Sequence, residues 1–202
     1  MNIESIPIEL KQRNQWVLWR LERRNGRWTK PPYQVNGEPA DKMNPLHWTS
    51  FQNALEAFSK AQGQFNGLGY VISSDDPYTV IDLDKCIIDG RLTDQARSIV
   101  ESMHSYTERS QSGQGLHIFV RAMKPGTRCK NQKQGFEMYD GSAYIAITGD
   151  HLPGTPGTIE ERQNAVVELY RRYWDKPNKK KKTSELPVPK SPPMDDETII
   201  II

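Results

Sequence analysis

The sequence predicts an α+β protein with a largely antiparallel sheet. Segments with the alternating pattern of strands and segments with the helical period are mixed along residues 1–175, without an internal repeat. In the second half, short strand-like segments follow one another across turns, which favours hairpins over parallel crossovers. At 202 residues, the chain is long enough for one substantial domain with a hydrophobic core.

The composition is that of a rather polar globular protein. Hydrophobic residues make up 36% of the chain and charged residues 26%, and the net charge of +2 neither supports nor excludes a nucleic-acid partner. There is no apolar run of membrane-spanning length and no signal-peptide pattern at the start, so we expect no membrane partner. Cys86 and Cys129 lack metal-ligand spacing, and we expect two reduced thiols in a cytoplasmic protein.

The expected elements follow from periodicity and turn residues. A strand at 15–24 ends at the turn Asn25–Arg27, because Asn-Gly accepts positive φ at little cost. The return segment 28–35 is expected to be an irregular or edge strand because its two prolines lack N–H donors. Residues 49–62 place apolar side chains at helical spacing behind a capping Thr or Ser. The later elements are expected as strands at 67–73 and 78–85, a helix at 93–105, strands at 105–110, 115–122, 136–140 and 143–150, and a closing helix at 158–174.

Two carboxylates, Asp82 and Asp84, interrupt the strand-like run TVIDLDK. Side chains two apart in a strand share one face, about 7 Å apart, so Ile81 and Leu83 can fill the opposite face. Two carboxylates on one face can bind a hard divalent cation such as Mg²⁺ or Mn²⁺ through oxygen ligands. The alternative is an exposed strand end with two solvated acids, since the pattern is short and common.

A serine and two glycines come directly before the strand that carries His117, in the run SQSGQGLHIFV. Small residues let backbone N–H groups approach an anion, so this turn can form a phosphate-binding nest, to which His117 can donate. The alternative is an ordinary hairpin turn followed by a structural histidine.

A third acid, Glu137, lies between Phe136 and Met138 in the short strand-like run GFEMYDG. Such a residue is either an edge residue that faces water or a third metal ligand. Asp140 is expected to be a turn residue ahead of Gly141.

Together, these motifs resemble the archaeo-eukaryotic primase superfamily, most closely its phage and plasmid primase–polymerase branch. The resemblance lies in their order and strand context and covers about residues 10–175. It implies an RRM-like palm with a largely antiparallel sheet plus a small N-terminal α/β module, with the site in the cleft between them. The catalytic residues that it implies are Asp82, Asp84, Glu137 and His117, with the three carboxylates as ligands of two divalent metals. The residues that it implies for nucleotide binding are Ser112, Gly113, Gly115, His117, Tyr144 and Thr148, although Tyr144 can equally be a core residue.

A template and primer need a basic surface. The candidates for nucleic-acid binding are Arg23, Arg24, Arg27 and Lys30 around the first hairpin, and Lys130 between the His and Glu strands. Trp28 and Tyr33 can stack on bases. Ordinary surface cations, with the aromatic residues facing the core, are the alternative.

The composition changes after the last predicted helix. Residues 1–175 are expected to form the catalytic domain, 176–193 a Lys- and Pro-rich linker, and 194–202 the truncated start of a following helical domain. We therefore expect the chain to be the N-terminal part of a longer protein.

The function that these features predict is a template-directed DNA primase–polymerase in phage or plasmid replication, using Mg²⁺ or Mn²⁺ to add NTPs or dNTPs. Its expected partners are a single-stranded DNA template, a primer and a replicative helicase, in the cytoplasm of a bacterial host. Two alternatives remain open: a metal-dependent nuclease or phosphoesterase, and a non-catalytic module that binds single-stranded nucleic acid. The Ser-Gly turn suits a triphosphate better than a nuclease site, and an RNA-stacking sheet has no use for the two acids.

Overall fold

The computed structural model describes residues 1–175, and it is an α+β structure built on two main antiparallel sheets. The predicted α+β class is therefore confirmed. The expected linker at 176–193 and the expected helical start at 194–202 lie outside the described residues. Within the described part, no helix combines the length and the apolar character needed to cross a bilayer.

The first sheet has four strands in the order β13–β5–β1–β4, and every neighbouring pair is antiparallel. Its strands are β1 (Trp16–Trp19), β4 (Pro32–Tyr33), β5 (Gly67–Ile72) and β13 (Ala143–Ile147). Because β13 comes from the second half of the chain, the N-terminal segment does not form this sheet by itself. Helix α2 (Phe51–Lys60) packs against this sheet through Trp16. The ring centroids of Trp16 and Phe51 are 4.9 Å apart.

The second sheet has six strands, ordered β11–β12–β6–β10–β14, with β9 also paired to β10. Its strands are β6 (Tyr78–Leu83), β9 (Thr107–Arg109), β10 (Leu116–Arg121), β11 (Lys130–Asn131), β12 (Phe136–Tyr139) and β14 (Glu160–Glu161). Only the β10–β14 pair is parallel. The prediction of a largely antiparallel sheet is confirmed for the described residues.

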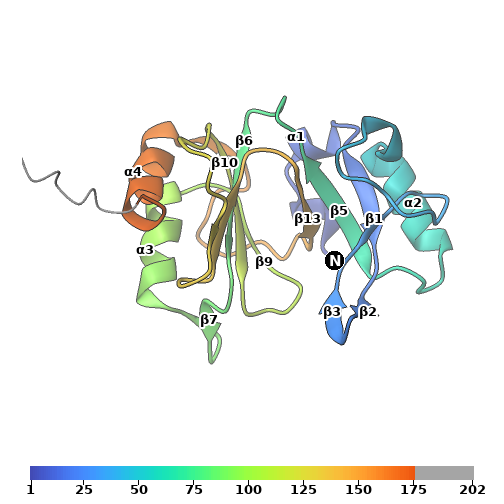
Figure 1. Ribbon diagram of the computed structural model, residues 1–202, viewed down its shortest axis with the longest axis horizontal. Helices are drawn as coiled ribbons and strands as arrows, with labels where there is room; N and C mark the ends of the chain where they lie inside the picture. Colours follow the sequence, from blue (N-terminus) through green and yellow to red (C-terminus); the bar gives the residue numbers. More distant parts are fainter. Residues whose placement is uncertain (176–202) are drawn as a thin grey trace, which may run out of the picture.

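The two faces of β6 have different neighbours. Ile81 and Leu83 belong to a hydrophobic cluster with α3 (Asp94–Met103) and α4 (Gln163–Tyr173), whereas Val80 belongs to a second cluster that includes residues of the four-stranded sheet. Figure 1 shows the same layers, with α3 and α4 on one side of the six-stranded sheet and β13, β5 and β1 on the other. Because alternate residues share a face, Asp82 lies on the side of Val80, toward the four-stranded sheet.

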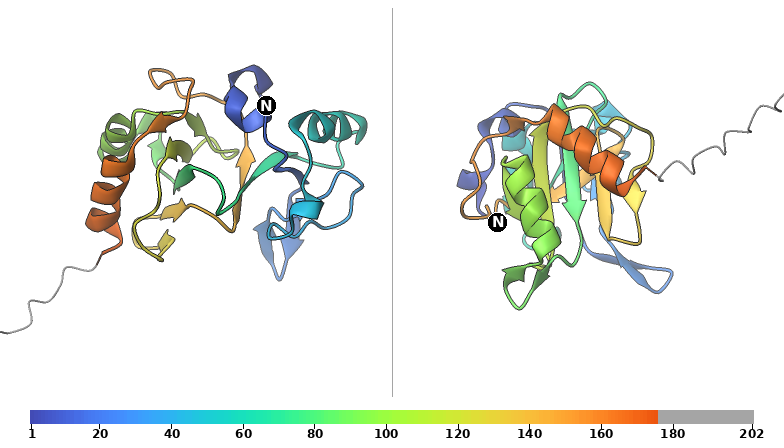
Figure 2. Two further views of the ribbon diagram at one scale, coloured as in Figure 1. Left: turned by 90° about the horizontal axis from the view of Figure 1, so that it is seen from above. Right: turned by 90° about the vertical axis from the view of Figure 1, so that its left-hand side faces the viewer.

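Capping residues explain where the predicted helices begin. Ser50 accepts a hydrogen bond from the N–H of Asn53 ahead of α2, and Thr93 does the same for Ala96 ahead of α3. The predicted helix at 158–174 begins later, at Gln163, because its first residues join the sheet edge as β14, parallel to β10. Figure 2 shows α4 beside α3 on one face of the six-stranded sheet.

Several short elements were not expected from the sequence. The predicted strand at 15–24 is interrupted after Trp19 and resumes as β2 (Glu22–Arg24), which pairs with β3 (Arg27–Thr29) across the predicted Asn-Gly turn. The additional elements are α1 (Ile8–Lys11), the hairpin of β7 (Ile87–Ile88) and β8 (Arg91–Leu92), and the single turns η1 (Ile3–Ser5) and η2 (Pro45–His47).

Candidate active site

A row of ionisable side chains crosses five neighbouring strands of the six-stranded sheet. The strand register places Lys130 opposite Glu137, Glu137 opposite Asp82, Asp82 opposite His117, and His117 opposite Glu108. Directly opposite residues of antiparallel strands point to the same face. These five residues, which we call the charged row, therefore line up on the face of the sheet that is turned toward the four-stranded sheet.

The two acids of the DLD run lie at the end of β6. Asp82 is half-buried in the last part of the strand, and Asp84 follows the strand as an exposed residue whose N–H donates to the carbonyl of Gly135 at 2.9 Å. Burial raises the pKa of Asp82, and the negative charges of Asp84 and Glu137 raise it further against the opposing effect of His117. A divalent cation bound to Asp82 would favour its charged form against both the burial and the neighbouring acids.

Glu137 is already bound by two neighbours. Its Oε1 accepts a hydrogen bond from Nζ of Lys130 at 2.7 Å, and its Oε2 accepts one from the hydroxyl of Tyr139. Within residues 1–175, no group of three His, Cys, Asp or Glu side chains is arranged to hold an ion. Asp82 and Asp84 offer the oxygen ligands that Mg²⁺ and Mn²⁺ prefer, but Glu137 has to release Lys130 before it can act as a third ligand.

His117 is held by a residue that the sequence reasoning missed. Its Nδ1 lies 3.0 Å from Oε1 of Glu108, a carboxylate that is completely buried. Burial by itself lowers the pKa of His117, but the hydrogen bond to Glu108 and the charge of Asp82 together leave that pKa raised. Since a carboxylate accepts the Nδ1 proton, Nε2 is the ring nitrogen that remains for a ligand.

Glu108 also ties the six-stranded sheet to the end of β13. Its carboxylate accepts hydrogen bonds from the N–H groups of Thr148 at 3.2 Å and Gly149 at 2.9 Å, and from the hydroxyl of Tyr106 at 2.9 Å. Thr148, a predicted nucleotide neighbour, is thereby held beside the charged row. The sequence did offer a signal for Glu108, because it is an acid inside the strand-like run SYTERS. The same kind of signal identified Asp82.

The Ser-Gly turn packs against the end of β6. Its backbone closes through hydrogen bonds from Ser110 N–H to Gly115 O and from Gly113 N–H to Ser110 O, each 2.9 Å long. The Ser110 hydroxyl accepts from the N–H of Gly115 and lies 3.1 Å from that of Ser112. A Cβ at Gly115 would lie only 2.8 Å from the carbonyl oxygen of Leu83. The structure thus brings the predicted phosphate-binding turn next to the predicted metal-binding acids.

A pocket of about 600 Å³ lies on the other side of this turn. It joins the turn to the four-stranded sheet, and its lining includes Trp19, Gly67, Gln111, Gly113 and Thr148. Two residues predicted for nucleotide binding, Gly113 and Thr148, therefore share one pocket.

Tyr144 lies in β13 of the four-stranded sheet, opposite Val71 of β5. Its ring packs against Gly69 of β5, so closely that a Cβ there would be 2.7 Å from the ring. Burial raises the pKa of its hydroxyl well above the usual range. Tyr144 is half-buried and belongs to neither of the two hydrophobic clusters, and its role at the nucleotide stays a prediction.

The predicted nucleic-acid residues have different surroundings. Arg23, Arg24 and Arg27 are exposed on the β2–β3 hairpin, where Arg24 pairs with Glu22 at 2.8 Å. Trp28 is 66% exposed and is available for stacking. Tyr33 is only 3% exposed, so the expectation that it stacks on bases is wrong: its ring packs against Phe65 in the core. The predicted DNA ligand Lys130 is instead paired with Glu137 here.

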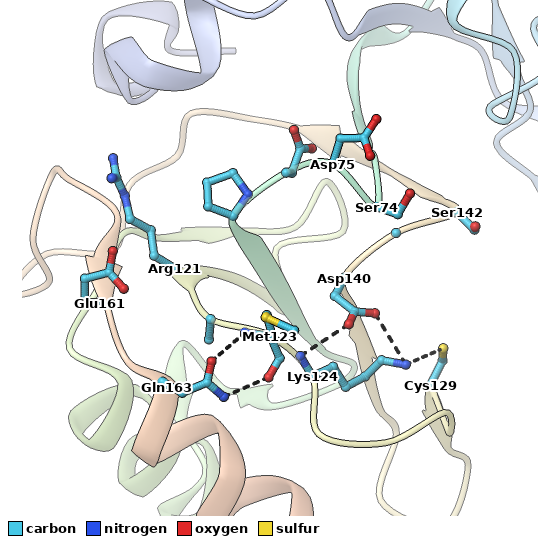
Figure 3. Close-up of a pocket in the computed structure, with 14 residues that line it drawn as sticks. Ser74, Asp75, Arg121, Met123, Lys124, Cys129, Asp140, Ser142, Glu161 and Gln163 are labelled. Atoms are coloured by element: carbon cyan, nitrogen blue, oxygen red, sulfur yellow. Dashed lines mark hydrogen bonds and ion pairs between the residues drawn. The ribbon is translucent and has the colours of Figure 1, made fainter.

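A pocket of about 750 Å³ at the opposite end of β6 is shown in Figure 3. One ion pair lies within its lining: Nζ of Lys124 is 3.5 Å from the Asp140 carboxylate and 3.3 Å from Sγ of Cys129. The pocket holds none of the residues of the charged row, and it adds nothing to the site at Asp82.

An α+β fold whose antiparallel sheet carries two acids and a histidine beside a Ser-Gly turn is the arrangement implied for phage-type primase–polymerases. The chain is 30% identical, over 99% of its length, to a protein named DNA primase-polymerase from Nitratiruptor phage NrS-1. It spans 27%, about a quarter, of the length of that relative. No family model matches the chain. The similarity confirms the resemblance that the sequence motifs indicate.

Proposed function

We propose that this chain carries out template-directed nucleotidyl transfer as the catalytic part of a DNA primase–polymerase. The observation that carries the proposal is the charged row, with Asp84 at its edge and the Ser-Gly turn packed beside it. The printed name of the phage relative, a DNA primase-polymerase, supports the same activity. In this proposal the six-stranded sheet is the RRM-like palm.

The proposed metal ligands are Asp82 and Asp84, joined by Glu137 once Lys130 has withdrawn. When bound, two Mg²⁺ or Mn²⁺ ions supply activation of the attacking 3′-hydroxyl and charge stabilisation at the leaving pyrophosphate. The contribution of the chain is to hold the carboxylates at fixed positions in β6, directly after it and in the neighbouring β12, which reduces the entropic cost of bringing the reacting groups together.

His117 and the Ser-Gly turn are the proposed ligands of the triphosphate. Glu108 fixes Nδ1 of His117, so that Nε2 is presented on the face where Asp82 lies. A cationic imidazole donates to a phosphate oxygen with a charge-assisted hydrogen bond. Ser112 adds its hydroxyl, whereas the N–H groups of Gly113 and Gly115 join only once they release the Ser110 oxygens to which they donate here. The neighbouring pocket with Thr148 accommodates the rest of the nucleotide.

The proposed partners are a single-stranded DNA template, a primer, and NTPs or dNTPs. The exposed hairpin arginines are proposed to contact DNA phosphates. A replicative helicase and a location in the bacterial host cytoplasm complete the proposed replication role in a phage or plasmid.

Extension of a labelled primer on a DNA template, with Mn²⁺ and dNTPs, tests the proposal. We expect extension that depends on template, dNTPs and divalent metal, and that stops with EDTA. Primer shortening without dNTPs would instead favour a nuclease built on the same acids. A folded protein that binds single-stranded DNA without extending the primer would favour a non-catalytic binding module.

Two alanine variants of the Ser-Gly turn distinguish the effect of close packing at Gly115 from the effect of the positive φ at Gly113. Gly115→Ala should cost about 1–3 kcal/mol of stability through overpacking and should lower extension, because its Cβ pushes on Leu83 and displaces the adjoining Asp84. Gly113 has a φ of +71° with open space around it, so Gly113→Ala should cost about 1 kcal/mol in backbone strain while the end of β6 keeps its position. Thermal unfolding and the extension rate of both variants check this. An equal fall in extension rate in the two folded variants would contradict the packing argument.

A further inference from the structure

One lysine connects the two sheets at the candidate active site. Lys30 lies between β3 and β4, and its Nζ donates a hydrogen bond of 2.8 Å to Oε1 of Gln111, inside the Ser-Gly turn. The same ammonium lies 5.7 Å from the ring centroid of Trp19 in β1. A residue predicted to touch DNA together with the hairpin arginines is therefore directed to the turn proposed to hold phosphate.

Among the described residues, no carboxylate forms an ion pair with the ammonium of Lys30. None of the ion pairs within residues 1–175 includes it, and its hydrogen-bond partner is a neutral amide. Desolvation of the ammonium lowers the pKa of Lys30, whereas the nearby carboxylates of Asp82 and Asp84 raise it. The ammonium is thus a cation held at the Ser-Gly turn and within the electrostatic influence of both acids, where a polyanion bound at the turn would contact it.

A second donor in the same place points to an anion. Trp19 is only 5% exposed and lines the 600 Å³ pocket, and among the described residues its buried Nε1–H has no acceptor. Buried N–H groups are rarely left without a partner, and those that are call for an explanation such as a ligand that the structure lacks. Its ring lies tightly against Gly67, where a Cβ would come within 2.9 Å of Nε1, so the indole is held in this position.

We propose that Lys30 binds the polyphosphate tail of the incoming nucleotide, from the side opposite His117. The tail would lie between the two sheets, with His117 and the Ser-Gly turn on the six-stranded side and Lys30 and Trp19 on the four-stranded side. This inference rests on the proposed function, and it assigns to the four-stranded sheet a direct part in recognising the number of phosphates. The neutral Gln111 side chain positions the ammonium without neutralising it.

The test compares nucleotides with three, two and one phosphates. Binding of a dNTP, dNDP and dNMP in the presence of Mn²⁺ is measured by calorimetry for the wild type, Lys30→Gln and Lys30→Arg. Lys60→Gln is the matched control, because Lys60 forms an exposed pair with Glu56 on α2, away from the site. We expect Lys30→Gln to weaken dNTP binding by about tenfold, the size of a lost charge-assisted hydrogen bond, and to leave dNMP binding unchanged. Lys30→Arg should recover part of the loss, and Lys60→Gln should match the wild type.

Three results would overturn the inference. An equal loss for dNTP and dNMP would make Lys30 a structural residue, and a loss of primer–template binding alone would make it a DNA ligand. Tighter Mn²⁺ binding in Lys30→Gln, with dNTP affinity unchanged, would make Lys30 only a counter-charge of the acids. Primer extension by the wild type separates a failure of this inference from a failure of the proposed function. If the wild type extends primers while Lys30→Gln keeps full dNTP affinity, only the inference about Lys30 fails. If the wild type neither extends primers nor binds dNTPs, the proposed function fails as well.

Discussion

Replacing either Asp82 or Asp84 with alanine should lower metal-dependent primer extension by on the order of 10²- to 10³-fold, and the double variant should show none. The reason is that both side chains lie at the end of β6 and are the proposed oxygen ligands of the metal. The rate of primer extension with Mn²⁺ measures the effect. Asp75→Ala is the matched control, since Asp75 is an exposed acid ahead of the opposite end of the same strand. A single variant that keeps the wild-type rate would remove its residue from the proposed metal site.

Asp82→Asn gives an independent check that the loss is not a folding defect. Burial and the negative charges of Asp84 and Glu137 raise the pKa of Asp82, so the folded protein binds this proton more tightly than the unfolded chain does. The wild type therefore loses stability as the pH rises from the ordinary aspartate range through the raised value, and asparagine removes that loss. In EDTA, we expect Asp82→Asn to unfold at a higher temperature than the wild type near neutral pH. This difference should shrink at a pH of about 4 or below.

Glu108→Ala should be the most destabilising change at the site, by about 3–5 kcal/mol. The completely buried carboxylate accepts hydrogen bonds from Thr148, Gly149 and Tyr106 and lies against Nδ1 of His117. Its removal leaves these donors buried without acceptors, and each such group carries its own desolvation cost. Urea unfolding measures the loss.

Glu108→Gln keeps the shape of the side chain and tests its second role. The glutamine can still accept from the backbone N–H groups, so it should cost less stability than alanine, but it no longer offers His117 a negative charge. We expect a folded variant whose KM for dNTP rises more than its kcat falls. The matched control is Glu56→Ala, which breaks an exposed ion pair on α2 and should leave both stability and extension nearly unchanged. A Glu108→Gln variant with an unchanged KM would limit Glu108 to a structural role.

The alternation of residues along one strand could be predicted, and here the structure agrees with the sequence. Ile81 and Leu83 were expected on one face and Asp82 on the other, and the two faces have the expected core and site neighbours. The predicted capping residue likewise located the start of α2, because the hydrogen bond involved spans only three residues.

The register between strands could not be predicted in the same way. Whether Glu108 lies opposite His117, or Lys130 opposite Glu137, depends on how the whole sheet assembles, and no local pattern encodes it. This is why Glu108 was missed. The segment 143–150 was expected as one strand of a largely antiparallel sheet, but its sequence did not say that Ala143–Ile147 would join the four-stranded sheet. The position of Lys30 beside Gln111 depends on contacts between residues 81 positions apart.

The most direct test of the account is to locate the metal. Crystals grown with Mn²⁺ and a non-hydrolysable dNTP analogue allow the ions to be placed by their anomalous scattering. The account predicts Mn²⁺ on the carboxylates of Asp82 and Asp84, with Glu137 released from Lys130 and the triphosphate in contact with His117. Clear density for the nucleotide with no Mn²⁺ at these two aspartates, or with the metal held elsewhere, would contradict it.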